Sequence, residues 1–174
     1  MTTGLLVIDL QRGMFGPGGL PYAGDAVLGR VAGLLDRARA QGVAVLHVRH
    51  DGGSGDDLER HTPGWEIHPA VAPEGDEPIV DKSRCSAFHG TNLHERLQKL
   101  GLTRLVVAGM QTEYCIDTAC REAHGLGYKV ALVGDGHTTF DAPSLTAEQI
   151  VAHHNLTLQR GGFVELVQAA TVGF

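Results

Sequence analysis

Cysteine is scarce in this sequence of 174 residues, which contains only Cys85, Cys115 and Cys120. An odd number of cysteines without a C-x-x-C pair argues against a disulfide framework, a redox pair and the usual spacing of a zinc site. This usage favours a reducing, cytoplasmic setting. Each cysteine is therefore considered on its own, and its thiol is either packed in the core or a reactive group.

Long apolar runs and an excess of positive charge are also missing. No run approaches the roughly 18 residues that span a bilayer, and the start of the chain lacks the basic segment of a signal peptide. The formal net charge is −6, whereas general nucleic-acid binders are usually basic. We therefore expect a cytoplasmic protein that acts on a small-molecule substrate, with no nucleic acid and no membrane as partners.

What the sequence does contain is a regular alternation of strand and helix patterns. Continuous apolar runs predict buried strands over residues 5–8, 43–48, 79–80, 104–108, 129–133 and 163–167. Helical spacing and capping pairs (Asn92 with Glu95, Thr146 with Gln149) predict helices over residues 25–41, 92–100, 113–126 and 146–159. This order predicts an α/β fold in one domain, residues 1–174, with a three-layer, Rossmann-like open parallel sheet of about six strands and helices on both faces.

Two connecting segments have their own interpretation. Residues 51–77 are rich in Gly, Pro, Asp and His without clear periodicity, which favours a functional loop over a domain linker. The stretch Gly134-Asp135-Gly136 lacks the spacing of a phosphate loop and is interpreted as a turn after the fifth strand.

Three residues that suit catalysis follow predicted strands. In open parallel sheets, ligands bind beyond the carboxyl ends of the strands, where Asp9, Lys82 and Cys115 are expected. Cys115 falls in the first turn of a predicted helix, so the helix dipole and Lys82 are expected to lower its pKa. Asp9 would accept the thiol proton. Taken singly, each has an ordinary alternative: a turn carboxylate, a surface lysine and an inert buried cysteine.

Three segments together resemble the isochorismatase-like cysteine hydrolases, a family that includes nicotinamidases and N-carbamoylsarcosine amidohydrolases. They are Leu6-Val7-Ile8-Asp9-Leu10-Gln11, Asp81-Lys82 before Ser86-Ala87-Phe88, and Gly109-Met110-Gln111-Thr112-Glu113-Tyr114-Cys115. The resemblance covers nearly the whole chain.

The resemblance implies an Asp-Lys-Cys catalytic triad of Asp9, Lys82 and Cys115. It also implies a cis peptide bond between Met110 and Gln111, with the backbone N–H groups of Gln111 and Cys115 forming an oxyanion hole. Family members commonly assemble, so a homo-oligomer, a dimer or tetramer, is expected.

Two departures narrow the expected activity. Nicotinamidases carry an Asp-x-His metal motif after the second strand, but no histidine follows Asp51 at the required place. His47 and His50 are interpreted as a satisfied strand histidine and a loop residue, so no metal and no cofactor are predicted. True isochorismatases can do without the nucleophilic cysteine. Because this chain keeps Cys115, we expect hydrolysis of a C–N bond in an amide, carbamoyl group or lactam-like ring.

Four aromatic residues flank these segments or lie in the long loop and are candidates for the substrate pocket: Phe15, Trp65, Phe88 and Tyr114. For each of them, ordinary packing is an equally good explanation. Cys85 and Cys120 are interpreted as structural.

Two alternatives to catalysis are considered. The first is a catalytically inactive ligand-binding or scaffold protein of the same fold. The second, a Rossmann-type nucleotide-binding protein, is disfavoured because Asp9-Leu10-Gln11-Arg12 stands where a glycine fingerprint would follow the first strand.

Overall fold

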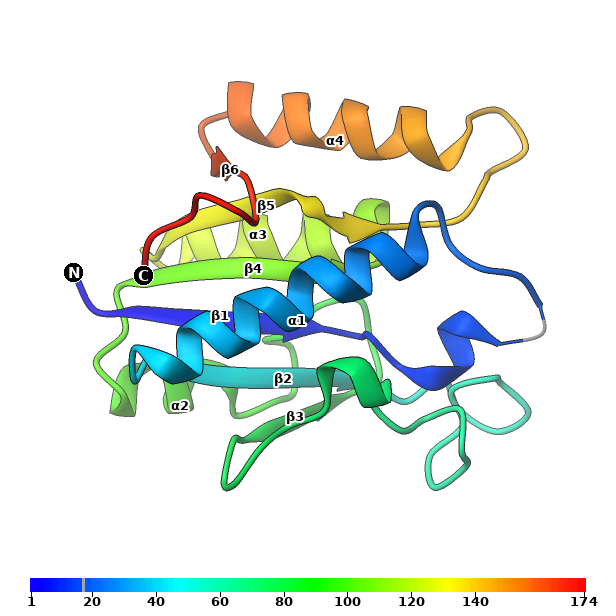
Figure 1. Cartoon of the computed structure of the whole chain (residues 1–174), viewed down its shortest axis with the longest axis horizontal. Coiled ribbons are helices and arrows are strands. Elements are labelled where there is room, and N and C mark those ends of the chain that lie inside the picture. Colours follow the sequence, from blue (N-terminus) through cyan, green and yellow to red (C-terminus); the bar gives the residue numbers. More distant parts are fainter. Residues whose placement is uncertain (17) are drawn as a thin grey trace.

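The fold is built on one parallel sheet. The computed structural model describes residues 1–16 and 18–174. Figure 1 shows the strands of the sheet side by side, with one helix in front of them. The strand order is β3-β2-β1-β4-β5-β6 and every pairing is parallel. This confirms the predicted fold class. The strands are β1 (Thr3–Ile8), β2 (Ala44–His50), β3 (Ile79–Lys82), β4 (Arg104–Met110), β5 (Lys129–Thr138) and β6 (Glu165–Val167).

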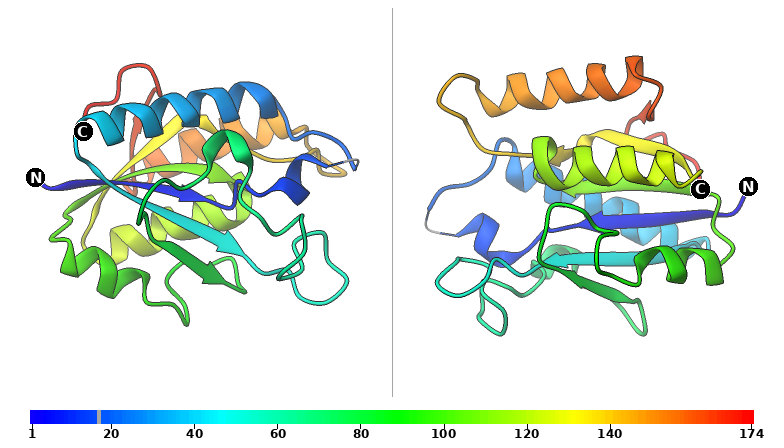
Figure 2. Two further views of the ribbon diagram at one scale, coloured as in Figure 1. Left: turned by 60° about the horizontal axis from the view of Figure 1, so that its bottom comes forward. Right: turned by 180° about the vertical axis from the view of Figure 1, so that it is seen from behind.

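Helices cover both faces of the sheet, as the views of Figure 2 show. On one face, α1 (Gly24–Ala40) packs on strand residues that include Leu5 and Val7. On the other face, α2 (Leu93–Lys99), α3 (Asp117–Gly125) and α4 (Ala147–Arg160) pack on residues that include Leu6 and Ile8. Alternate residues of β1 therefore enter opposite layers, which is why its apolar run is continuous. In the described part of the chain, no helix is long and apolar enough to cross a membrane.

Two local predictions were wrong, and hydrogen bonding and register explain why. Asn92 does not form a capping box, because its side chain accepts a hydrogen bond from Arg96 and Thr91 caps the Leu93 N–H instead. The segment 134–136 is not a turn but lies inside β5. Val107 of β4 pairs with Leu132 of β5, but Gly109, two residues on, pairs with His137, five residues on. Residues 134–136 are therefore extra residues of β5 that form an irregularity in the strand. The capping box of Thr146 and Gln149 does form.

The order in which strands are added to the sheet reverses between β1 and β4. From these central neighbours, β2 and β3 extend to one side and β5 and β6 to the other, so the switch point for ligand binding lies beyond their carboxyl ends. Gly109 keeps the two strands close there, because a Cβ at this position would lie 2.0 Å from the Ile8 carbonyl oxygen. Its φ of +132° also strongly favours glycine. Both chain termini lie at the other end of the sheet (Figure 1).

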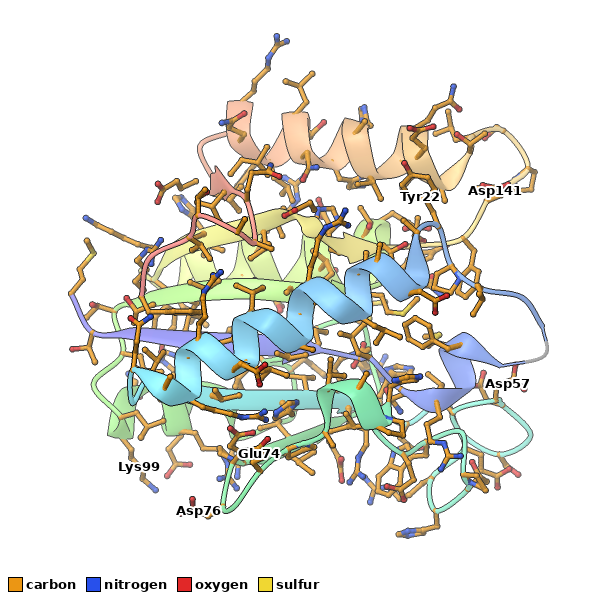
Figure 3. The ribbon with its side chains drawn as sticks, in the orientation of Figure 1. Tyr22, Asp57, Glu74, Asp76, Lys99 and Asp141 are labelled. Carbon is orange, nitrogen blue, oxygen red and sulfur yellow. The ribbon has the colours of Figure 1, made fainter. Side chains whose placement is uncertain are left out.

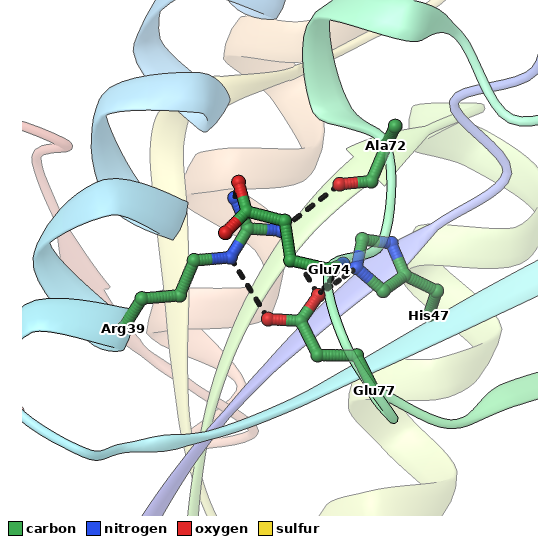
Figure 4. A network of polar contacts seen from close by, with 5 residues as sticks. All are labelled: Arg39, His47, Ala72, Glu74 and Glu77. Carbon is green, nitrogen blue, oxygen red and sulfur yellow. Dashed lines mark hydrogen bonds and ion pairs between the residues drawn. The ribbon is translucent and has the colours of Figure 1, made fainter.

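A polar network beside the buried His47 fixes the connection into β3 (Figure 4). The Glu77 carboxylate accepts hydrogen bonds from the Arg39 guanidinium at 2.8 and 2.9 Å and lies 3.1 Å from His47 Nε2. Burial alone would raise the pKa of Glu77, but the hydrogen bonds from Arg39, the Glu74 N–H and His47 lower it to about 2. His47 is fully buried on β2. It is the strand histidine that the sequence analysis expected, but only its Nε2 is satisfied: the buried Nδ1 has no hydrogen-bond partner among the described residues.

Replacing Gly109 by alanine tests the close approach of β1 and β4. We expect Gly109→Ala to lower the free energy of unfolding by about 3 kcal/mol or more, because the clash and the positive φ both oppose a Cβ. Gly29→Ala is the matched control, since Gly29 lies on an exposed turn of α1 with open space around it; it should stabilise by about 0.5–1 kcal/mol. Chemical denaturation measures both, and equal effects would contradict the explanation.

Candidate active site

The structure brings Asp9, Lys82 and Cys115 together at the carboxyl ends of three strands. Asp9 follows β1, Lys82 is the last residue of β3, and Cys115 lies in the turn after β4. Lys82 Nζ lies 2.7 Å from Asp9 Oδ2 and 3.2 Å from Cys115 Sγ. Asp9 has a φ of +52°, a left-handed conformation that aspartate tolerates better than most residues and that often marks functional sites.

Lys82 has more acceptors around it than protons to donate. Besides Asp9 and Cys115, its Nζ lies 3.0 Å from His50 Nδ1 and 3.0 Å from the Arg84 carbonyl oxygen, whereas an ammonium donates three hydrogen bonds. The contact with His50 arises because His50 and Lys82 are register partners on β2 and β3. His50 was interpreted as a loop residue; it is instead the last residue of a strand and a neighbour of the triad.

Asp9, Lys82 and Cys115 are buried and share their charge. Burial raises the pKa of Asp9 above its usual value, and Lys82 offsets only part of this effect. Burial would lower the pKa of Lys82, but the charges of Asp9 and Cys115 outweigh it and raise the pKa. Burial and the Lys82 charge lower the pKa of His50. The 2.7 Å contact of Lys82 with Asp9 is that of an ion pair, which carries no net charge.

The pKa of Cys115 is raised, which corrects the expectation of a lowered value. Burial is the main cause, and the Asp9 carboxylate adds to it while Lys82 offsets part. Ionising the thiol to bulk water would leave a net negative charge in a buried site. Proton transfer from Cys115 to Asp9 leaves the net charge at zero, so the thiolate forms at lower cost when Asp9 takes the proton.

Cys115 does not lie in the first turn of a regular α-helix, as the sequence predicted. It belongs to a π-helical turn, η3 (Thr112–Ile116), which precedes α3. A buried chain of hydrogen bonds holds this turn: Thr112 Oγ1 lies 2.8 Å from His137 Nδ1, and His137 Nε2 lies 2.8 Å from Asn155 Oδ1. Burial lowers the pKa of His137 to about 4, so the ring is neutral. The local sequence does not indicate this support, because the three residues come from separate elements, η3, β5 and α4.

Gln11 connects the end of β2 to the loop of residues 51–77. Its fully buried side chain donates to the carbonyl oxygens of His50 at 2.8 Å and Trp65 at 2.9 Å, and accepts from the His50 N–H at 2.8 Å. Trp65 is buried, and the Arg49 guanidinium lies 3.3 Å from the centroid of its ring. These contacts attach the loop of residues 51–77 to the sheet beside the triad.

A cavity of about 400 Å³ opens at Cys115, a size that suits a small metabolite. Tyr114 lines it, whereas Phe15, Trp65 and Phe88 are not among its lining residues. Cys85 is exposed at this cavity, which corrects its interpretation as structural; Cys120 is fully buried, as expected. The described lining residues are Asp9, Gly13, Met14, Gly18, Gly19, His50, Asp56, Asp57, Leu58, Cys85, Gln111, Tyr114, Cys115 and Phe140.

The Met110–Gln111 peptide bond is cis. No backbone or side-chain acceptor is found for the Gln111 N–H among the described residues. The Gln111 side chain lines the cavity, and its Nε2 lies 3.9 Å from Met14 Sδ. The Gln111 N–H therefore has no partner in the described part of the chain, and both Gln111 and Cys115 line the cavity.

The residues considered for a metal have other partners. His47 is paired with Glu77, His50 contacts Lys82, and Asp51 forms an ion pair with Arg60 at 3.1 Å. In the described ranges, 1–16 and 18–174, no group of three His, Cys, Asp or Glu side chains is placed to hold a metal ion.

Known proteins resemble this chain in sequence and in fold. A streptothricin hydrolase from Streptomyces noursei is 40% identical over 141 residues, covering 80% of this chain and 51% of that protein. An Arabidopsis thaliana protein named probable inactive nicotinamidase is 32% identical over 174 residues, covering 88% and 89%. The crystal structure of a cysteine hydrolase from Pseudomonas syringae pv. phaseolicola is 28% identical, with a TM-score of 0.90 over 97% of this chain and 89% of that chain.

The extent of these matches differs. The chain spans about half the length of the two Streptomyces noursei streptothricin hydrolases that it matches. The family model for the isochorismatase domain matches residues 3–164, which include the triad and the cavity. The chain therefore belongs to the isochorismatase family of hydrolases.

Proposed function

We propose that the protein is a cysteine-dependent hydrolase that cleaves a C–N bond of an amide, carbamoyl or lactam-like compound through a thioester. The observation that carries this proposal is the contact of Lys82 with both Asp9 and Cys115 at the base of an open cavity. A buried carboxylate with a raised pKa next to a thiol is a general base matched to its proton donor.

The first half of the proposed reaction acylates the enzyme. Asp9 takes the proton of Cys115 while Lys82 stabilises the thiolate, and the sulfur attacks the carbonyl carbon. The N–H groups of Gln111 and Cys115 donate to the developing oxyanion. Collapse of the tetrahedral intermediate breaks the C–N bond, and Asp9 returns its proton to the departing nitrogen.

The second half regenerates the enzyme. Water attacks the thioester carbonyl, Asp9 accepts its proton, and the same two N–H groups hold the second oxyanion. Collapse of this intermediate breaks the C–S bond, the sulfur leaves as a thiolate and recovers the proton from Asp9, and the acid departs. The net reaction adds one water across the C–N bond. Lys82 stays an ammonium throughout.

The alternative is a ligand-binding protein with an inactive triad. It is considered because the Arabidopsis thaliana relative is named a probable inactive nicotinamidase. Streptothricin is one candidate substrate, because the Streptomyces noursei relatives carry it in their names. A panel of small primary amides, carbamoyl compounds, lactams and streptothricin covers the proposed chemistry.

Hydrolysis of this panel tests the proposal directly. We expect the protein to release ammonia or open the ring of at least one compound, and Cys115→Ala to lose at least about 10³-fold in kcat/KM. Cys85→Ser is the matched control, because Cys85 lies at the same cavity but has no role in the proposed chemistry. Ammonia assay and mass spectrometry measure the products. Undiminished turnover by Cys115→Ala, or none by the native protein, would overturn the proposal.

The pH dependence of Cys115 alkylation tests the charge sharing. Because the Asp9 charge raises the pKa of the thiol and the Lys82 charge lowers it, the midpoint should move down in Asp9→Asn and up in Lys82→Gln. We expect the native midpoint to lie above that of an ordinary thiol. Site-resolved mass spectrometry after iodoacetamide treatment reads the rate, and unfolding curves confirm that both variants are folded. Shifts in the same direction would contradict the shared charge.

A further inference from the structure

The cavity is lined by negative charge alone. Its charged lining residues are Asp9, Asp56 and Asp57, and no lysine or arginine is among the described lining residues. Lys82 already neutralises Asp9 at 2.7 Å, and His50 accepts a hydrogen bond from Lys82 with a ring that is neutral. Asp56 and Asp57 are therefore the carboxylates of the described lining that no cation neutralises, and they favour positive charge in the cavity.

The backbone holds these two carboxylates in place. A Cβ on Gly13 or on Gly64 would lie 2.6 or 2.0 Å from the Asp57 carbonyl oxygen, so both glycines allow the loop to pack closely. Asp56 Oδ1 accepts the Leu58 N–H at 2.8 Å, and Leu58 itself is buried. Figure 3 labels Asp57 at the end of the molecule where this loop lies beside η1 (Arg12–Phe15).

Other acids of the same region are neutralised by arginine. Asp51 pairs with Arg60 at 3.1 Å, and Asp81 pairs with Arg49 at 2.8 Å and with Arg60 at 3.5 Å. Asp56 and Asp57 form no ion pair with any residue that the structure describes, although both are exposed. Arg49 on β2 and Arg60 in the loop thus pair with Asp51 and Asp81, and within the described residues neither pairs with Asp56 or Asp57.

We propose that Asp56 and Asp57 select substrates that carry a cationic group, an amine or a guanidinium, beside the C–N bond that is cleaved, and disfavour carboxylate substrates. The apolar lining by Met14, Leu58 and Phe140 accommodates the carbon skeleton between the cation and the carbonyl group. As a statement about substrate, this inference rests on the proposed function. The selection of cations over anions is a property of the cavity and is measurable without turnover.

Charged thiol reagents test the selection at Cys115. In a Cys85→Ser background, Cys115 is treated with 2-aminoethyl methanethiosulfonate, a cation, and with 2-sulfonatoethyl methanethiosulfonate, an anion. In each reaction the sulfur of Cys115 forms a mixed disulfide and methanesulfinate leaves. The rate with the cationic reagent is divided by the rate with the anionic reagent, and this ratio is normalised to the same ratio measured for the free thiol 2-mercaptoethanol. We expect a normalised ratio well above one that falls as salt is added.

Charge removal identifies the residues responsible. We expect Asp56→Asn with Asp57→Asn to lower the normalised ratio roughly 10-fold at low ionic strength, because each carboxylate attracts one reagent and repels the other. Asp76→Asn is the matched control: Asp76 is exposed on the turn before β3 and lies far from Asp57 in Figure 3. The control should leave the ratio unchanged.

The outcomes separate this inference from the proposed function. A ratio near one, an unchanged ratio in the double variant, or no reaction of Cys115 with either reagent would overturn the inference. A cation-selective cavity in a protein that hydrolyses no amide would overturn the proposed function alone. For an active protein, an amide with a terminal amine should have a kcat/KM at least 10-fold higher than the matched amide without it. The double variant should lose this difference and still hydrolyse the neutral amide.

Discussion

The buried ion pair of Asp9 and Lys82 is the interaction on which the site depends. Removing one member of such a pair leaves an uncompensated charge and costs about 3–5 kcal/mol, so the fold must bring both side chains to one point. It does so with three strand ends: β1 supplies the carboxylate, β3 the ammonium, and the turn after β4 the thiol. Gly109 lets β1 and β4 approach closely enough for this arrangement. The pair also decides how the thiol ionises, because a proton that leaves Cys115 is held by Asp9 at no change in net charge.

The sequence predicted the sheet, its layers and the three residues at strand ends, although Lys82 is the last residue of β3 and does not follow it; apolar runs and strand ends are local signals. It did not predict that His50 contacts Lys82, since that contact depends on the register between β2 and β3. The turn assigned to residues 134–136 was wrong for a similar reason: the glycines there lie in a strand that shifts its register against β4. The raised pKa of Cys115 reflects burial beside Asp9, and neither burial nor that contact is visible in the local sequence.

The residues of the proposed chemistry and those of the proposed selectivity lie in different parts of the molecule. The triad is mounted on the sheet and on a turn tied by His137 to Asn155. Asp56, Asp57 and Leu58 of the cavity lining come from the loop of residues 51–77, which Gln11 and the stacked pair of Arg49 and Trp65 attach to the sheet. A family that keeps the first part and varies the second can act on different substrates with one mechanism.

Attack of Cys115 on a carbonyl carbon is tested most directly by rapid acid quenching during turnover of the best substrate from the amide panel, followed by peptide mass spectrometry. We expect an acyl adduct on Cys115, and release of the acyl group as a hydroxamate when hydroxylamine is present. Sustained hydrolysis with no adduct at Cys115 and no hydroxamate would contradict it.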